Sequence, residues 1–180
     1  MTPMDAPAPT WTAPTPSPVD GPLVGPDRPM LTGYLAWQRS VLLNVCAGLT
    51  GEQLARRAVP TSSLSLLGLV RHLTKVERTW LRIRAAGEDV APVFDLALGK
   101  DHDFEATDPE QAPEDFARYE AECRATDAAV ASVDFEHAVV LADGQEMSLR
   151  MIYVHLIGEY ARHLGHADLL REAIDGATGR

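Results

Sequence analysis

The chain has 180 residues, of which 46 % are hydrophobic and 23 % charged, which is close to the composition of an ordinary globular domain. Its formal charge is −10, because 16 lysines and arginines stand against 26 aspartates and glutamates. This balance argues against a nucleic-acid partner, and no apolar run approaches the roughly 20 residues of a membrane span. Cys46 and Cys123 lie far apart and form no disulfide framework, and no signal-peptide pattern is present, so we expect a cytoplasmic protein.

Residues 1–28 form a proline-rich segment, since nine of the 13 prolines fall in the first 29 residues. Such a segment buries too little apolar area to offset its ordering entropy, so we expect a flexible, disordered tail. Docking of Trp11, or of Val19 and Leu23, on a surface groove is the alternative. Residues 29–180 are expected to form a single domain.

Apolar residues recur at helical spacing in four stretches after this tail, which predicts an all-α four-helix bundle. Thr50 and Gln53 have the form of a capping box and predict a short extra turn after the first helix. Ser148 is suited to cap the fourth helix, and Gly176 to end it. The four expected helices cover residues 31–49, 62–87, 113–133 and 149–174.

Two connections stand out between these helices. Residues 89–112 carry two prolines and seven acidic side chains, which predicts a long irregular connection between the second and third helices. Connections of this length often cover a site. Asp143 and Gly144, flanked by Val139, Val140 and Leu141, predict a small hairpin before the fourth helix.

The fourth helix carries an unusual group of polar side chains: His155, Glu159, His163 and His166. Residues four apart on a helix lie on one face, about 6 Å apart along the axis. Glu159 and His163 can therefore direct their ligand atoms to one point, as the two histidines of an HExxH helix do. His155 and His166 are either hydrogen-bond partners of the ligands or polar residues flanking them.

His72, in the middle of the second helix beside its apolar stripe, is the candidate third ligand. With Glu159 and His163 it gives two imidazoles and one carboxylate, and three protein ligands leave a position open for substrate. Zinc is the default metal, and nickel, iron(II), cobalt and manganese accept the same donors. The alternative is that His72 is an ordinary core histidine with a hydrogen-bond partner.

At these residues the chain resembles the DinB-like superfamily of metal-binding four-helix bundles, and more narrowly its actinobacterial branch of mycothiol-dependent S-transferases. The resembling segments are SLSLLGLVRHLTKVERTWL, ADGQEMSLR and HLIGEYARHLGHADLLREAIDG. The last is the most specific, and the resemblance covers roughly residues 30–177.

The resemblance implies a divalent metal held by His72, Glu159 and His163, and a low-molecular-weight thiol such as mycothiol as co-substrate. It also implies a homodimer, and it suggests pocket positions for Arg39 and Trp80. A metal with an open position deprotonates a bound thiol, and the thiolate is the reactive form. The leading hypothesis is therefore a metal-dependent thiol S-transferase that attacks an electrophilic small molecule.

Two alternatives remain open from the sequence. One is a metal-binding stress or accessory protein without catalysis. The other is a metal-dependent hydrolase, which needs a general base near the attacking water. Only His155 and His166 are close enough in sequence to fill that role.

Overall fold

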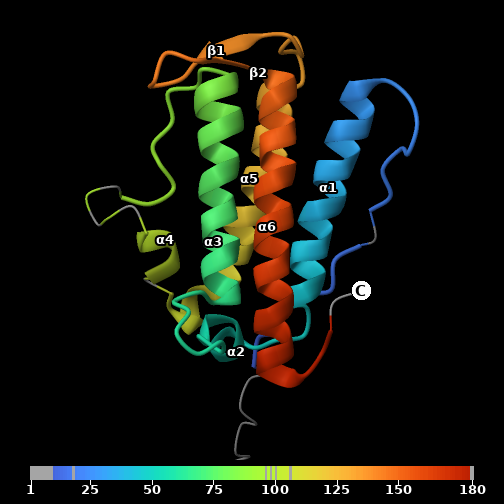
Figure 1. Cartoon of the computed structure of the whole chain (residues 1–180). Coiled ribbons are helices and arrows are strands. Elements are labelled where there is room, and N and C mark those ends of the chain that lie inside the picture. The colour runs from blue at the N-terminus through green and yellow to red at the C-terminus, as the bar shows by residue number, and fades with distance from the viewer. Residues whose placement is uncertain are drawn as a thin grey trace, which may run out of the picture.

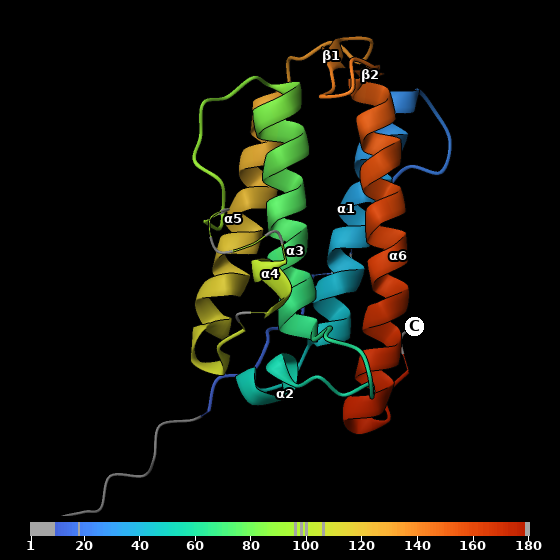
Figure 2. The ribbon, with the colours of Figure 1, turned by 60° about the vertical axis from the view of Figure 1, so that its left-hand side comes forward.

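The computed structural model describes residues 10–17, 19–95, 97, 99, 101–105 and 107–178, and these ranges form an all-α fold with one small hairpin. The prediction of an all-α fold is confirmed. The described residues form six α-helices, and the long ones lie side by side (Figures 1 and 2). No helix within these ranges is both long and apolar enough to cross a bilayer. The long helices are α1 (Asp27–Cys46), α3 (Leu66–Glu77), α5 (Ala112–Val130) and α6 (Leu149–Asp175).

Two further helices are short. The first, α2 (Gly51–Ala55), is the predicted turn, and its capping box is present: the Thr50 hydroxyl accepts from the Gln53 backbone while the Gln53 side chain accepts from the Thr50 backbone. The second, α4 (His102–Glu105), lies in the long connection and was not predicted as a helix. The count of helices therefore exceeds the predicted four.

The ends of α3 and α6 follow from local hydrogen bonds. Ser65 caps α3 by accepting from the Gly68 N–H at 3.1 Å, and Ser148 caps α6 by accepting from the Met151 N–H at 3.2 Å. Gly176 ends α6 with a φ of 78°, a left-handed conformation that glycine adopts without steric cost. The caps predicted for the fourth helix are confirmed.

The core lies between the long helices, where α1 packs on α6 and α3 packs on both α5 and α6. The apolar stripe predicted for the second helix supplies much of it. Leucines dominate the fully buried side chains, among them Leu35, Leu42, Leu66, Leu67, Leu69, Leu73 and Leu81. Burial of each such side chain contributes roughly 2 kcal/mol.

Beyond Glu77 the helix continues as η1 (Arg78–Ala85), which is π-helical. The sequence predicts one regular helix as far as Gly87, so this segment departs from it. A π-helix adds residues to each turn, which rotates the side chains after Glu77 relative to α-helical spacing. The periodicity of apolar residues does not reveal such a shift.

The predicted connection over residues 89–112 runs back along the molecule, because α3 and α5 point in the same direction (Figure 2). It contains α4 and η3 (Pro109–Gln111), and residues 96, 98, 100 and 106 lie outside the described ranges.

The predicted hairpin is present as β1 (Ala138–Val140) paired with antiparallel β2 (Glu146–Ser148).

Part of the proline-rich segment is ordered against the helices, so the expectation of a wholly disordered tail is wrong. Thr12 forms a β-bridge with Thr50, and Ala13 is buried and hydrogen-bonded to the backbone of Gly48 and Leu49. The alternative of a docked Trp11 fits, since its ring meets Phe116 of α5 edge-on at 5.5 Å. The rest of that expectation, over residues 1–9 and 18, falls outside the described ranges.

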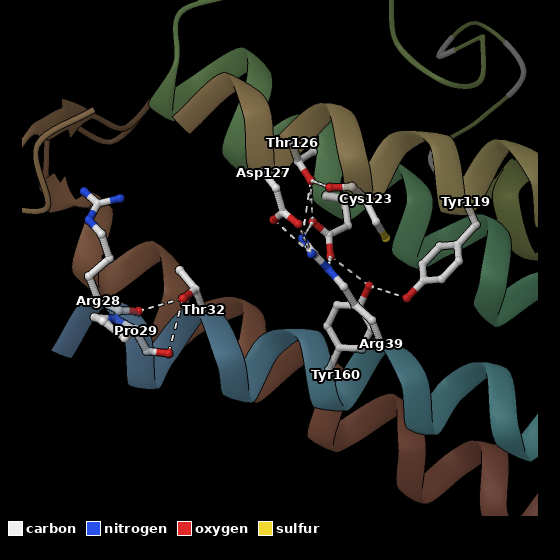
Figure 3. A network of polar contacts seen from close by, with 10 residues as sticks. Arg28, Pro29, Thr32, Arg39, Tyr119, Cys123, Thr126, Asp127 and Tyr160 are labelled. Atoms are coloured by element: carbon white, nitrogen blue, oxygen red, sulfur yellow. Dashed lines mark hydrogen bonds and ion pairs between the residues drawn. The ribbon is translucent and has the colours of Figure 1, made fainter. Parts of the chain in front are cut away.

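A buried polar network joins the four long helices (Figure 3). Arg39 of α1 donates two hydrogen bonds to Glu77 of α3, at 2.7 and 2.8 Å, and the Arg39 and Glu77 residues are 7 % and 0 % exposed. Tyr160 of α6 donates to the same carboxylate at 2.8 Å and accepts from Tyr119 of α5. Thr126 of α5 also donates to Glu77, at 3.2 Å. One carboxylate thus contacts α1, α5 and α6.

Glu77→Gln is expected to lower the free energy of unfolding by about 3 kcal/mol or more, because it leaves the buried Arg39 guanidinium without its main counter-charge. Urea denaturation measures this. Glu114→Gln is the matched control: Glu114 is exposed and, among the residues that the structure describes, pairs only with Arg118 one turn away, so a loss below about 0.5 kcal/mol is expected. Equal losses in the two variants would contradict the role given to the network.

Candidate metal centre

Three side chains predicted from the sequence converge between α3 and α6. His72 comes from α3, and Glu159 and His163 come from successive turns of α6. One ligand atom from each lies within 4.8 Å of the other two. Glu159 Oε2 stands 3.9 Å from His72 Nε2 and 3.7 Å from His163 Nε2.

The helices position these groups simply. The four-residue spacing places Glu159 and His163 on one face of α6, and the packing of α6 on α3 brings that face to His72. The imidazole rings of His72 and His163 meet edge-on at 4.6 Å. The Glu159 side chain keeps 25 % of its surface exposed, so the group opens to solvent on the carboxylate side.

Burial shapes the electrostatics of the group. It is the largest cause that lowers the pKa of His163 to about 4, and the neighbouring His72 lowers that pKa further, while Glu159 opposes the shift. His163 is therefore neutral at pH 7, and a neutral imidazole carries the lone pair that a metal requires.

The donor set fits a divalent metal. His72 Nε2 is buried and has no hydrogen-bond partner among the described residues. Such an atom costs about 1–3 kcal/mol unless something binds it. Zinc bonds of about 2.0–2.1 Å in tetrahedral geometry place neighbouring ligand atoms roughly 3.4 Å apart. The observed separations of 3.7 and 3.9 Å need only small side-chain movements to reach that value.

Two residues that the sequence analysis did not single out complete the surroundings of His72. Asp103 Oδ2 lies 2.8 Å from His72 Nδ1 and 2.5 Å from the Lys75 ammonium. The ring of Phe104 stacks on the His72 ring with centroids 4.5 Å apart. Both come from α4, in a connection without helical periodicity, and the only signal in the sequence was the length of that connection.

The charge of Asp103 is maintained despite its burial. Burial raises the pKa of this carboxyl group, but hydrogen bonds from His72 and Lys75 outweigh it, so the net pKa lies below its ordinary value. Asp103 is therefore ionised near neutral pH and acts as a hydrogen-bond acceptor.

The weaker sequence candidates lie at different distances from the three ligands. His166 approaches His163 directly, with their Nδ1 atoms 3.4 Å apart. His155 lies one turn from Glu159 on α6 and packs on Trp80 of η1 at 4.3 Å. His155 and Trp80 therefore contact each other between α6 and η1.

Arg39 has a different environment from the one suggested by family resemblance. Its guanidinium is hydrogen-bonded to Glu77, Asp127 and Thr126. Burial lowers its pKa, but the adjacent Glu77 charge raises the net pKa well above the ordinary arginine value. The structure therefore gives Arg39 a place in the internal network of the helices.

The metal-free protein is expected to lose stability as the pH falls from about 6.5 to about 4. In that window the unfolded chain binds a proton at residue 163 that the folded chain does not, so the free energy of unfolding decreases, by at most about 3 kcal/mol. Urea denaturation of chelator-treated protein across this range measures it. His163→Gln is expected to flatten the dependence of the free energy of unfolding on pH, whereas His137→Gln, at an exposed position, is expected to retain it. The same slope in both variants would contradict the assignment.

Comparison with known proteins assigns the chain to a family. A family model described as mycothiol-S-transferase matches residues 30–176, from the first turn of α1 to the C-terminal cap of α6. The match includes His72, Glu159 and His163. No curated protein and no solved structure matches the chain significantly. The chain belongs to the mycothiol-S-transferase family.

Proposed function

We propose that this protein is a metal-dependent thiol S-transferase that uses mycothiol, or a related low-molecular-weight thiol, against an electrophilic small molecule. The observation that carries the proposal is the convergence of His72, Glu159 and His163, with a buried and partnerless Nε2 on His72. Membership of the mycothiol-S-transferase family supports the transferase role and the identity of the thiol.

We propose His72, Glu159 and His163 as the metal ligands, with zinc as the first candidate and nickel or iron(II) as others. When bound, the metal supplies a Lewis acid that stabilises the thiolate form of the co-substrate. A set with a single carboxylate leaves the metal positively charged, which favours an anionic fourth ligand. The exposed side of Glu159 is where the thiol enters.

The protein has no activated thiol of its own among these elements, which supports an external nucleophile. Cys46 is fully buried, and burial raises its pKa to about 12. Burial likewise raises the pKa of the Cys123 thiol, and the charge of Glu77 adds to that shift. Both thiols are protonated at neutral pH, and a thiol reacts as its thiolate.

A hydrolase is less well supported by the surroundings of the site. A general base for water has to reach the reacting atoms. His155 packs on Trp80, and His166 faces His163, so neither side chain stands free beside the ligands. A metal-binding protein without catalysis shares the same ligands, and only an activity measurement separates it from a transferase.

The fold and assembly complete the proposal. We propose that the four long helices form a bundle of the DinB-like type and that the protein acts in the cytoplasm as a homodimer. Tyr34 and Trp37 of α1 are partly exposed, and their rings contact each other at a tilt with centroids 5.2 Å apart, which makes them available to a second copy of the chain.

Metal loading tests the ligand set. The protein purified without an affinity tag is expected to bind about one zinc or nickel ion per chain by elemental analysis. His163→Ala is expected to weaken the affinity by more than about 100-fold, because it removes a ligand and not merely a supporting contact. His137→Ala, at an exposed position in a loop, is the matched control and is expected to retain the metal. A wild-type protein that stays metal-free after incubation with both ions would contradict the proposal.

Thiol consumption then separates a transferase from a binding protein. The loaded enzyme is expected to accelerate loss of free mycothiol in the presence of an electrophile such as a haloarene or an epoxide. His163→Ala, assayed without added metal, is expected to lose most of that rate, because little of the variant then holds a metal ion. Loss of electrophile without loss of thiol would indicate hydrolysis. Metal binding without either reaction would favour the accessory protein.

Sedimentation velocity tests the assembly. The wild-type protein is expected to sediment with twice the 19.6 kDa mass of one chain. Trp37→Glu is expected to shift the distribution toward the monomer, because it places a charge in the proposed contact. Glu114→Gln on α5 serves as the control. A monomeric wild type across the micromolar range would contradict the homodimer.

A further inference from the structure

We propose that Asp103 is a positioning residue for His72: its carboxylate fixes the imidazole in the Nδ1–H form and leaves the Nε2 lone pair facing Glu159 and His163. This inference rests on the proposed function, since it assigns a purpose to the contact at the same metal centre. It concerns a residue from the connecting segment, outside the ligand set.

The direction of the hydrogen bond follows from the partners. His72 Nδ1 and Asp103 Oδ2 are 2.8 Å apart, and an ionised carboxylate has no proton to donate. The proton between them therefore belongs to the imidazole. When the ring carries one proton, that proton lies at Nδ1 and Nε2 is left as an acceptor, and Nε2 is the atom without a partner among the described residues.

The structure holds Asp103 firmly in this position. The residue is 1 % exposed, and the Lys75 ammonium lies 2.5 Å from the same Oδ2 atom that receives the imidazole proton. Arg71 of α3 donates to the Asp103 backbone carbonyl at 3.1 Å, so the main chain of α4 is also fastened. The stacked Phe104 ring limits rotation of the imidazole. The Asp103 hydrogen bond, its support by Lys75 and Arg71, and the stacked Phe104 ring together fix the position and the orientation of the His72 imidazole.

A carboxylate behind a histidine has a known physical effect on metal sites. It selects the tautomer, orients the ring and increases the basicity of the ligating nitrogen, and losing it typically costs about 10–100-fold in metal affinity. A merely structural Asp103, which only tied α4 to Lys75, would have neither consequence. The tautomer of His72 and the metal affinity are therefore the two readouts that separate these roles.

The tautomer is measured first, on the metal-free wild-type protein. Long-range ¹H–¹⁵N correlation spectra of the imidazoles at pH 7.5, assigned with His72→Gln, are expected to show His72 as the Nδ1–H tautomer. Asp103→Asn is expected to reduce the population of the Nδ1–H tautomer. A carboxylate can only accept a hydrogen bond, whereas the amide NH2 of asparagine can donate one to an unprotonated Nδ1. A wild-type His72 in the Nε2–H form would overturn the inference. This measurement needs no metal, so its outcome is independent of whether the proposed function holds.

Metal affinity is measured next, with zinc and a competing chelator. Asp103→Asn is expected to bind zinc about 10–100-fold more weakly than wild type. Glu122→Gln is the matched control: Glu122 is a buried carboxylate of α5 paired with Arg78 and Arg82, and it has no contact with the three ligands. Unchanged affinity in Asp103→Asn, or an equal loss in the control, would overturn the inference. If the wild type binds neither zinc nor nickel, the proposed function fails while the tautomer result still decides the role of Asp103.

Discussion

The arrangement of the long helices depends on the hydrogen bonds made by the buried carboxylate of Glu77. It accepts hydrogen bonds from Arg39 of α1, Thr126 of α5 and Tyr160 of α6, so one buried charge links all four long helices. Glu77 lies five residues after His72, and Tyr160 directly follows Glu159. The network therefore sets the spacing of α3 and α6 close to the ligands, and a shift in either helix would disturb both.

This arrangement is demanding, because burying ions costs several kcal/mol each before their attraction is counted. Arg39 and Glu77 offset the cost with paired hydrogen bonds, and the Tyr119 and Tyr160 hydroxyls extend the network. Hydrogen bonds are directional, so sliding one helix along another would leave donors and acceptors of this network unpaired. We infer that the polar network contributes more to fixing the relative positions of the helices than to overall stability.

The sequence predicted the parts of the structure that depend on local periodicity. The spacing of Glu159 and His163 on one helix and the place of His72 beside an apolar stripe led to three groups that the structure brings together. The same reasoning missed Asp103, because its role depends on how an irregular connection returns across α3. It also missed the π-helical turns after Glu77 and gave the docking of Trp11 only as an alternative, since both are decided by packing between distant segments.

The placement of the two cysteines, one buried and one half-buried, has a consequence for the proposed chemistry. Under the proposed function the protein would meet alkylating molecules at every turnover, and any accessible thiolate of its own would be modified together with the co-substrate. Cys46 has no exposed surface, and burial raises the pKa of both cysteine thiols, so the chain offers these molecules little to react with. In a thiol transferase of the proposed kind, nucleophilic reactivity would thereby be confined to the thiol that leaves with the product, and the protein itself would be protected from self-inactivation.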